Sequence, residues 1–241
     1  MSYCTIQSDD KLYCKGHNLA RRPKFCYNFV AMRHLKLTPP LLIITMGYPG
    51  SGKTFFSRQF AEQYGLPRIS EDMLRFELFE KPLFSSDESD IIKRIFQYTL
   101  EEFLKSQQTI ICDGLFLSKL ERLELIKIAN KQGYRTLTVW LQTDIQTSSL
   151  RASKRDRRNP DDRFSFNMDQ STFSSFKNKL QRPDEKEQSI VISGKHAFKS
   201  QSLSVLRKIT GMYAEQIDVN KPVIESPKRP AVKPRANQLI Q

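Results

Sequence analysis

The sequence has few of the features that mark secreted or membrane proteins. It contains only 4 cysteines in 241 residues, too few for a disulfide framework in a chain of this size. No apolar stretch approaches the roughly 20 residues that a membrane-spanning helix needs. The first ten residues lack the basic start and apolar stretch of a signal peptide. We therefore expect a cytoplasmic protein with reduced thiols and no membrane partner.

Acidic residues are scarce relative to basic ones. There are 26 aspartates and glutamates against 39 lysines and arginines, so the formal net charge is +13. Such a balance favours a polyanionic partner, nucleic acid first, although a solvated basic surface explains it equally well. Part of the excess lies after Val219, where basic residues alternate with prolines. This composition predicts a disordered basic tail over residues 217–241.

The most informative stretch is residues 47–54, Gly-Tyr-Pro-Gly-Ser-Gly-Lys-Thr, which matches the P-loop pattern G-x-x-x-x-G-K-[ST]. Its glycines let the backbone turn its N–H groups toward phosphate oxygens, and Lys53 is spaced to reach the β- and γ-phosphates. The Thr54 hydroxyl is a ligand for Mg²⁺. An apolar run at 41–46 precedes the loop and predicts a buried strand, and residues 53–64 predict a helix. We expect ATP to bind at Gly47, Tyr48, Pro49, Gly50, Ser51, Gly52, Lys53 and Thr54.

Strand and helix patterns alternate through the middle of the chain. Further strands are predicted at 68–70, 109–113, 135–141 and 189–193, with helices between them and a final helix at 202–216. This order predicts an α/β fold of the P-loop NTPase type: a parallel five-stranded sheet flanked by helices, as in nucleoside-monophosphate kinases. Ligands in such sheets bind beyond the carboxyl ends of the strands. We therefore expect four residues to meet at one edge, namely Lys53, Asp72, Asp113 and Asp144.

The predicted kinase domain covers residues 40–216. Residues 1–39 read as a flanking segment, and Met32 is an alternative natural start. Cys14 and His17 have the spacing of half a zinc site, but the other cysteines and histidines complete no compact finger.

Asp72 follows the second predicted strand and opens a helix for which Ser70 is a suitable N-cap. It is our candidate base for the proton of an attacking hydroxyl. Arg75 lies one helical turn further on, where a guanidinium fork suits an anionic part of the acceptor. The alternative is that Asp72 only complements the helix dipole.

Asp113 ends an apolar strand and is a candidate Mg²⁺ group together with Thr54. Gly114 follows it, where hydrolytic ring ATPases carry a glutamate, so transfer to an acceptor is favoured over ATP hydrolysis. An ordinary aspartate at a strand end is the alternative. A basic stretch follows Asp144, and helical spacing aligns Arg151, Lys154, Arg155 and Arg158.

We interpret this basic stretch, about residues 150–165, as a helical lid that closes over ATP, supplies positive charge and excludes water. A solvated basic helix or a nucleic-acid-binding patch is the alternative.

Together these segments resemble the P-loop kinases of the polynucleotide 5′-kinase and zeta-toxin type, which are often labelled AAA-family ATPases. The resemblance spans about residues 40–215. It rests on the P-loop, segments 70–75, 110–114 and 133–135, the lid arginines, and Arg182-Pro183-x-Glu185.

The resemblance implies catalytic roles for Lys53, Asp72, Arg75, and Arg151 or Arg155. Two departures matter. No D-x-D occurs, so the phosphatase module often fused to polynucleotide kinases is missing, and Gly114-Leu115 replaces the family's pair of a small residue and asparagine.

The sequence therefore predicts an ATP- and Mg²⁺-dependent kinase that phosphorylates a hydroxyl, with a nucleic-acid 5′-hydroxyl as the first candidate acceptor. A small-molecule or nucleotide-sugar phosphotransferase of the zeta-toxin type is one alternative. A nucleotide- or nucleic-acid-binding module without transfer activity is the other.

Overall fold

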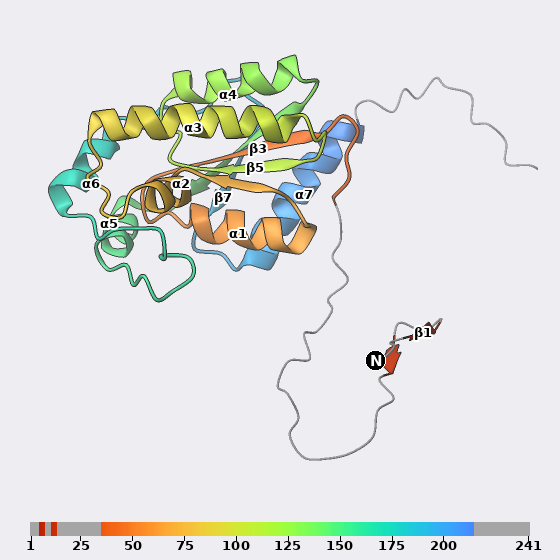
Figure 1. The fold of residues 1–241 in the computed structure, drawn as a ribbon, viewed down its shortest axis with the longest axis horizontal. Helices are drawn as coiled ribbons and strands as arrows, with labels where there is room; N and C mark the ends of the chain where they lie inside the picture. Colours follow the sequence, from red (N-terminus) through yellow and green to blue (C-terminus); the bar gives the residue numbers. More distant parts are fainter. Residues whose placement is uncertain (1–4, 8–10, 14–34, 215–241) are drawn as a thin grey trace, which may run out of the picture. The chain divides into compact units, whose positions relative to one another are not determined.

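The computed structural model of the chain describes residues 5–7, 11–13 and 35–214 (Figure 1). It separates into two units, residues 1–32 and 33–241. The first contributes a short antiparallel pair, β1 (Thr5–Gln7) and β2 (Lys11–Tyr13). The predicted zinc half-site at Cys14 and His17, the alternative start at Met32 and the basic tail lie outside the described residues and remain predictions.

The second unit is built on a five-stranded parallel sheet in the order β4-β5-β3-β6-β7. Its first strand along the chain, β3 (Leu41–Met46), lies in the middle with every residue buried, because helices cover both faces. All four further predicted strands are present within one residue of their expected bounds: β4 (Arg68–Ser70), β5 (Ile110–Asp113), β6 (Arg135–Gln142) and β7 (Ser189–Ser193). The predicted fold class is therefore confirmed.

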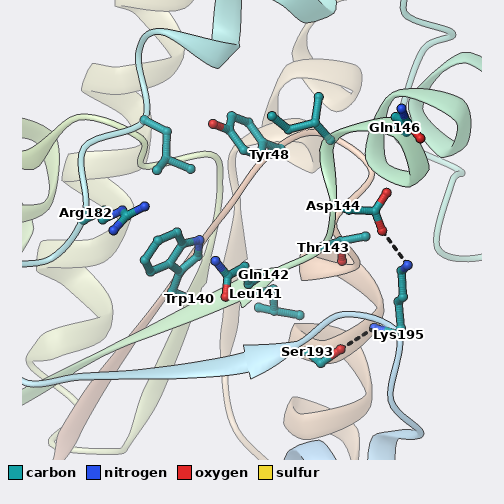
Figure 2. A pocket seen from close by; sticks show the side chains of 12 residues that line it. Tyr48, Trp140, Leu141, Gln142, Thr143, Asp144, Gln146, Arg182, Ser193 and Lys195 are labelled. Carbon is teal, nitrogen blue, oxygen red and sulfur yellow. Dashed lines mark hydrogen bonds and ion pairs between the residues drawn. The ribbon is translucent and has the colours of Figure 1, made fainter.

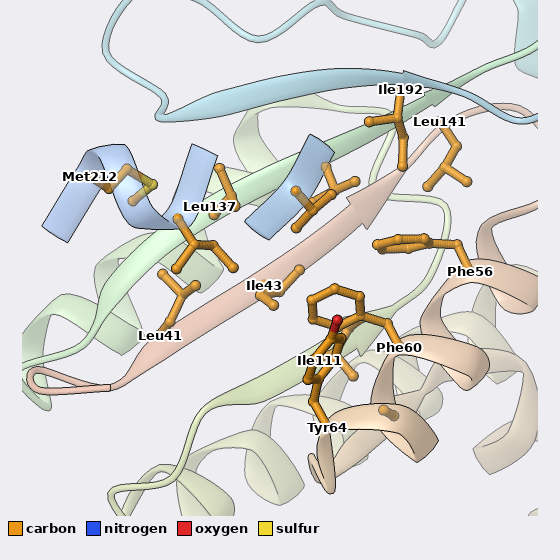
Figure 3. Close-up of a cluster of buried hydrophobic side chains, with 14 residues drawn as sticks. Leu41, Ile43, Phe56, Phe60, Tyr64, Ile111, Leu137, Leu141, Ile192 and Met212 are labelled. Atoms are coloured by element: carbon orange, nitrogen blue, oxygen red, sulfur yellow. The ribbon is translucent and has the colours of Figure 1, made fainter. Parts of the chain in front are cut away.

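Two layers of helices enclose the sheet (Figure 1). On one face, α1 (Lys53–Tyr64) and α7 (Phe198–Ala214) pack against alternate residues of β3 and β6. Figure 3 shows this cluster, with Phe56 and Phe60 of α1 below the strands and Met212 of α7 beside them. The opposite face packs on α3 (Ser86–Leu104) and α4 (Lys119–Lys131). Both layers leave the carboxyl ends of the strands uncovered, and the loops that form the candidate site lie there.

Three shorter helices surround those carboxyl ends. They are α2 (Glu71–Leu78), α5 (Ile145–Ser153) and α6 (Gln170–Lys177). The expected N-cap is confirmed, since the Ser70 hydroxyl accepts a hydrogen bond from the N–H of Met73 at 3.4 Å. Across the described ranges, no helix combines the length and apolar character needed to cross a bilayer.

Candidate active site

The P-loop joins β3 to α1 and is held close to α5. Gly47, Gly50 and Gly52 have φ values of 145°, 76° and 99°, in the region that favours glycine. At Gly50 the need is also steric, because a Cβ there would lie 2.2 Å from the carbonyl oxygen of Ser148 in α5. The loop can therefore take this shape only with glycine, as the motif predicts.

Lys53 lies beneath this loop, only 7% exposed. Its Nζ donates hydrogen bonds to the carbonyl oxygens of Gly47 at 3.0 Å and Tyr48 at 2.8 Å. Burial lowers the pKa of Lys53 to about 8, against the opposing pull of the Asp113 carboxylate. The ammonium group is thus desolvated and held by neutral carbonyls, so an incoming phosphate would be a stronger partner.

Ser51 and Gly194 form a close contact that the sequence did not suggest. The Ser51 carbonyl accepts a hydrogen bond from Thr143 Oγ1 at 3.1 Å, and a Cβ on Gly194 would lie 1.9 Å from the same oxygen. The loops after β6 and β7 therefore brace the P-loop. Within residues 35–214, the Ser51 Oγ is buried with no hydrogen-bond partner. An unpaired buried hydroxyl in a P-loop fits a site that takes phosphate oxygens.

A cavity of about 200 Å³ opens where α1 begins. It brings together three predicted site residues, Thr54, Asp72 and Arg155, from three separate segments. The sequence reasoning missed several other residues of its wall, which are Arg58, Arg68, Ser70, Pro160, Asp161, Arg163, Phe164 and Ser165. Three of its four arginines pair with acidic side chains, Arg58 with Asp161 and Glu62, Arg68 with Asp113 and Arg155 with Asp162. Among the described residues Arg163 has no ion-pair partner, so it is the arginine of this wall best able to meet an anionic ligand.

Asp72 stands in the first turn of α2 and is open to the cavity. Desolvation by the surrounding protein, followed by the charge of Asp113, raises the pKa of Asp72, whereas Arg155 and Lys53 lower it. Burial also raises the pKa of the adjacent Glu71, to about 8. Since the Ser70 hydroxyl already caps α2, Asp72 is not needed as a cap. Its carboxylate is placed to accept a proton from a group in the cavity.

Asp113 ends β5 and is 3% exposed. Its Oδ2 accepts a hydrogen bond from Arg68 Nη2 at 2.9 Å, and Arg68 Nε donates to Ser57 Oγ at 3.2 Å. The described residues contain no group of three or more histidine, cysteine or acidic side chains that would hold a metal alone. The predicted Mg²⁺ ligands Thr54 and Asp113 would therefore need phosphate oxygens and water to complete a coordination shell.

The prediction of a helix over residues 150–165 is wrong beyond Ser153, whereas the role of this segment as a lid stays a prediction. Helix α5 ends at Ser153, and the chain runs without an α-helix until α6 begins at Gln170. The stripe predicted for Arg151, Lys154, Arg155 and Arg158 therefore does not form. Two tertiary hydrogen bonds replace helical ones, from Met168 N–H to the Ala152 carbonyl at 3.0 Å and from Arg155 N–H to Asn167 Oδ1 at 2.8 Å.

The two predicted lid arginines lie in different places. Arg155 reaches the cavity, where its Nε is buried without a partner among residues 35–214 and its Nη1 lies 3.6 Å from Asp162. Arg151 instead donates to the carbonyl oxygen of Gly194 at 3.2 Å, beside the loop after β7. Asp144, expected at the same edge, is the N-cap of α5 and forms an ion pair with Lys195.

An aromatic cluster holds the loop that contains Arg155 over α2. The rings of Phe84 and Phe166 lie 4.0 Å apart between centroids, and those of Phe76 and Phe164 lie 6.5 Å apart. Phe164 also lines the cavity. The loop between α5 and α6 is therefore fixed over the Asp72 side of the site by packing.

Arg75 has a different partner from the one expected. Its guanidinium donates to Glu88 Oε1 at 2.5 Å and lies over the ring of Phe84 at 4.9 Å. Arg75 does not line the 200 Å³ cavity. Glu88 is thirteen residues away along the chain, so helical spacing alone gave no sign of this pairing.

A parallel sheet with β3 at its centre, helices on both faces and a P-loop between β3 and α1 are the features of the P-loop kinase fold. A family model described as an AAA domain (AAA_33) matches residues 42–183, and the chain belongs to this family. No curated protein sequence matches the chain.

Several solved structures share the fold at low sequence identity. A gluconokinase from Sinorhizobium meliloti 1021 superposes with a TM-score of 0.54 at 18% identity, over 74% of this chain and 98% of its own. Kti12 of Chaetomium thermophilum, solved with ADP-AlF3, gives 0.52 at 19%, over 70% and 97%. The APS kinase CysC of Mycobacterium tuberculosis, solved with AMPPNP and APS, gives 0.51 at 15%, over 71% and 98%.

Proposed function

We propose that this chain is an ATP- and Mg²⁺-dependent kinase that transfers the γ-phosphoryl group of ATP to a hydroxyl, with a nucleic-acid 5′-hydroxyl as the favoured acceptor. The observation that carries the proposal is the 200 Å³ cavity, which joins the Thr54 end of the P-loop to a carboxylate, Asp72, and to Arg155. Phosphoryl transfer needs these three kinds of group in one place.

In this proposal the P-loop, residues 47–54, holds the triphosphate. Lys53 leaves the carbonyls of Gly47 and Tyr48 for phosphate oxygens, and Ser51 Oγ gains the partner it lacks. Thr54 and Asp113 would hold Mg²⁺, which would neutralise phosphate charge. To bind the ion, Asp113 would have to share its carboxylate between Mg²⁺ and Arg68, or its contact with Arg68 would have to shift.

Asp72 acts as the base. A hydroxyl in the cavity gives its proton to the Asp72 carboxylate while Arg155 stabilises the negative charge of the transferring group. Arg151, which donates to the Gly194 carbonyl and does not line this cavity, is given no part in the transfer. Arg163, in place of Arg75, binds the anionic part of the acceptor, because the charge of Arg75 is already neutralised by Glu88.

Arg163 in the cavity wall and the net charge of +13 favour a nucleic-acid acceptor. The small volume of the cavity favours the second candidate, a small-molecule or nucleotide-sugar phosphotransferase. A binding module without transfer activity is the third. The dependence of activity on salt concentration distinguishes the candidates. Contacts to a phosphate backbone weaken steeply as salt rises, whereas turnover of a small acceptor changes little.

The test is transfer of label from γ-labelled ATP to a panel: a 5′-hydroxyl DNA, the matching RNA, a nucleotide sugar, and water. We expect label on an oligonucleotide with the wild-type protein and none with Lys53→Ala. Label on the nucleotide sugar alone would replace the favoured acceptor by the second candidate. ATP binding without transfer to any acceptor would contradict the kinase proposal.

A further inference from the structure

A second and larger cavity, about 810 Å³, lies beyond the carboxyl ends of β6 and β7. The cavity is lined by one P-loop residue, Tyr48, by the strand ends and by the segment after α6 (Figure 2). It shares no lining residue with the 200 Å³ cavity, and residues 50–54 take no part in it. Its volume falls within the range of small-molecule sites. None of the predicted catalytic residues lines it, namely Lys53, Asp72, Arg75, Arg151 and Arg155.

Aromatic side chains form part of its wall. Side chains alternate along β6, so that Leu141 faces α1 and α7 whereas Trp140 faces the opposite side. There Trp140, the single tryptophan of the chain, is only partly buried and lines the cavity. Tyr48 lies across the cavity from it in Figure 2, with its hydroxyl donating to the Lys177 carbonyl at 3.3 Å. The cavity thus offers two aromatic surfaces to a planar ligand.

Of the two cations that line the cavity, one has no ion-pair partner within the described part of the chain. Asp144 and Lys195 neutralise each other as an ion pair on one side (Figure 2). On the other side Arg182 is exposed, lies near Trp140 in the view, and has no ion-pair partner among the described residues. Gln142, also in the wall, adds an amide that donates and accepts. A planar ring with an anionic group is the complementary ligand.

We propose that this cavity is a second nucleotide site, which binds a mononucleotide without residues 50–54 of the P-loop. The base stacks with Trp140, its polar edge bonds to the amide of Gln142, and the phosphate pairs with Arg182. A purine or pyrimidine nucleotide supplies these three features in one small molecule. The proposal does not depend on kinase activity.

The fluorescence of Trp140 reports directly on this cavity, since no other tryptophan contributes to the emission. The experiment titrates AMP into the full chain carrying Lys53→Ala, which removes the P-loop lysine, and follows tryptophan fluorescence. We expect a saturable change in emission. Arg182→Gln in the same background should weaken AMP binding about tenfold, because a charge-assisted contact is lost. Adenosine, which lacks the phosphate, should bind about tenfold more weakly than AMP.

Arg207→Gln is the matched control. Arg207 is an exposed arginine on α7 and does not line the cavity, so its loss should leave AMP binding unchanged. The proposal fails if AMP leaves the emission of Trp140 unchanged. It also fails if Arg182→Gln binds AMP as the parent does, or if the wild-type signal disappears with Lys53→Ala, which would place the ligand at the P-loop.

Discussion

At the scale of single residues, the buried ammonium group of Lys53 makes ATP binding depend on pH. Its pKa is about 8 in the free protein, and bound phosphates raise it, so binding takes up a proton above that pH. Affinity for an ATP analogue should be full below pH 8 and fall up to about tenfold per pH unit above it. Calorimetric titration between pH 7 and 9.5 measures this.

Lys53→Arg is the control, because arginine stays charged over this range. The variant should lose the slope, whatever its affinity at pH 7. An equal slope in both proteins would assign the titration to another group.

Gly194 offers a second prediction at this scale. A methyl group there would meet the Ser51 carbonyl at 1.9 Å and Thr143 Oγ1 at 2.4 Å, so the loop after β7 must move away from the P-loop. Gly194→Ala should destabilise the protein by about 1–3 kcal/mol and weaken ATP binding. Denaturant unfolding and an ATP titration measure the two effects.

Gly211→Ala is its matched control. Gly211 lies in α7, where a Cβ would meet nothing within 4 Å. That substitution should leave ATP binding unchanged and stabilise the protein by about 0.5–1 kcal/mol. Similar unfolding midpoints for the two variants would refute the bracing role of Gly194.

At the scale of elements, the buried pair of Arg122 in α4 and Glu187 before β7 joins distant segments. The pair is bidentate at 2.8 and 3.0 Å, and Arg122 Nη1 also donates to the carbonyls of Phe116 and Leu117, in the loop after β5. Arg122→Leu leaves the Glu187 charge unpaired and should cost about 3–5 kcal/mol. Denaturant unfolding measures this cost.

Two comparisons make the Arg122 prediction specific. Arg122→Leu combined with Glu187→Leu should lose less stability than Arg122→Leu alone, because no buried charge remains. The exposed pair of Lys93 and Glu124 is the surface reference, and Lys93→Ala should cost less than about 1 kcal/mol. A double variant no more stable than the single one would count against the charge argument.

The sequence was sufficient for the sheet and for the P-loop because both depend on local patterns. Apolar runs such as 41–46 gave the strands, and the glycine spacing gave the loop. The segment after α5 shows the limit of such reasoning. Its residues have helical spacing, yet the Ala152 carbonyl is taken by Met168 N–H, sixteen residues on. Contacts of this kind are decided by tertiary structure and leave no local signal.

The same limit applies within the site. Thr54, Asp72 and Arg155 were expected and lie around one cavity. Arg68 was missed because its partner, Asp113, belongs to the neighbouring strand β5, and only the pairing of β4 with β5 brings them together.

At the scale of the whole molecule, the net charge of +13 predicts how salt acts on an oligonucleotide acceptor. Each phosphate contact releases counterions, so the KM for a 5′-hydroxyl oligonucleotide should rise about tenfold or more between 50 and 200 mM salt. The KM for ATP should change far less over the same range. Steady-state kinetics at several salt concentrations measure both, and a flat oligonucleotide response would favour the small-acceptor candidate.

The measurement that tests the central proposal most directly compares phosphoryl transfer and ATP binding in Asp72→Asn and wild type. The asparagine keeps the shape of the side chain but does not accept the proton. We predict unchanged ATP affinity and a loss of transfer of about 10²-fold or more. Asp90→Asn, an exposed position on α3, should behave as wild type. Transfer by Asp72→Asn at the wild-type rate would contradict the proposed base and the site built around it.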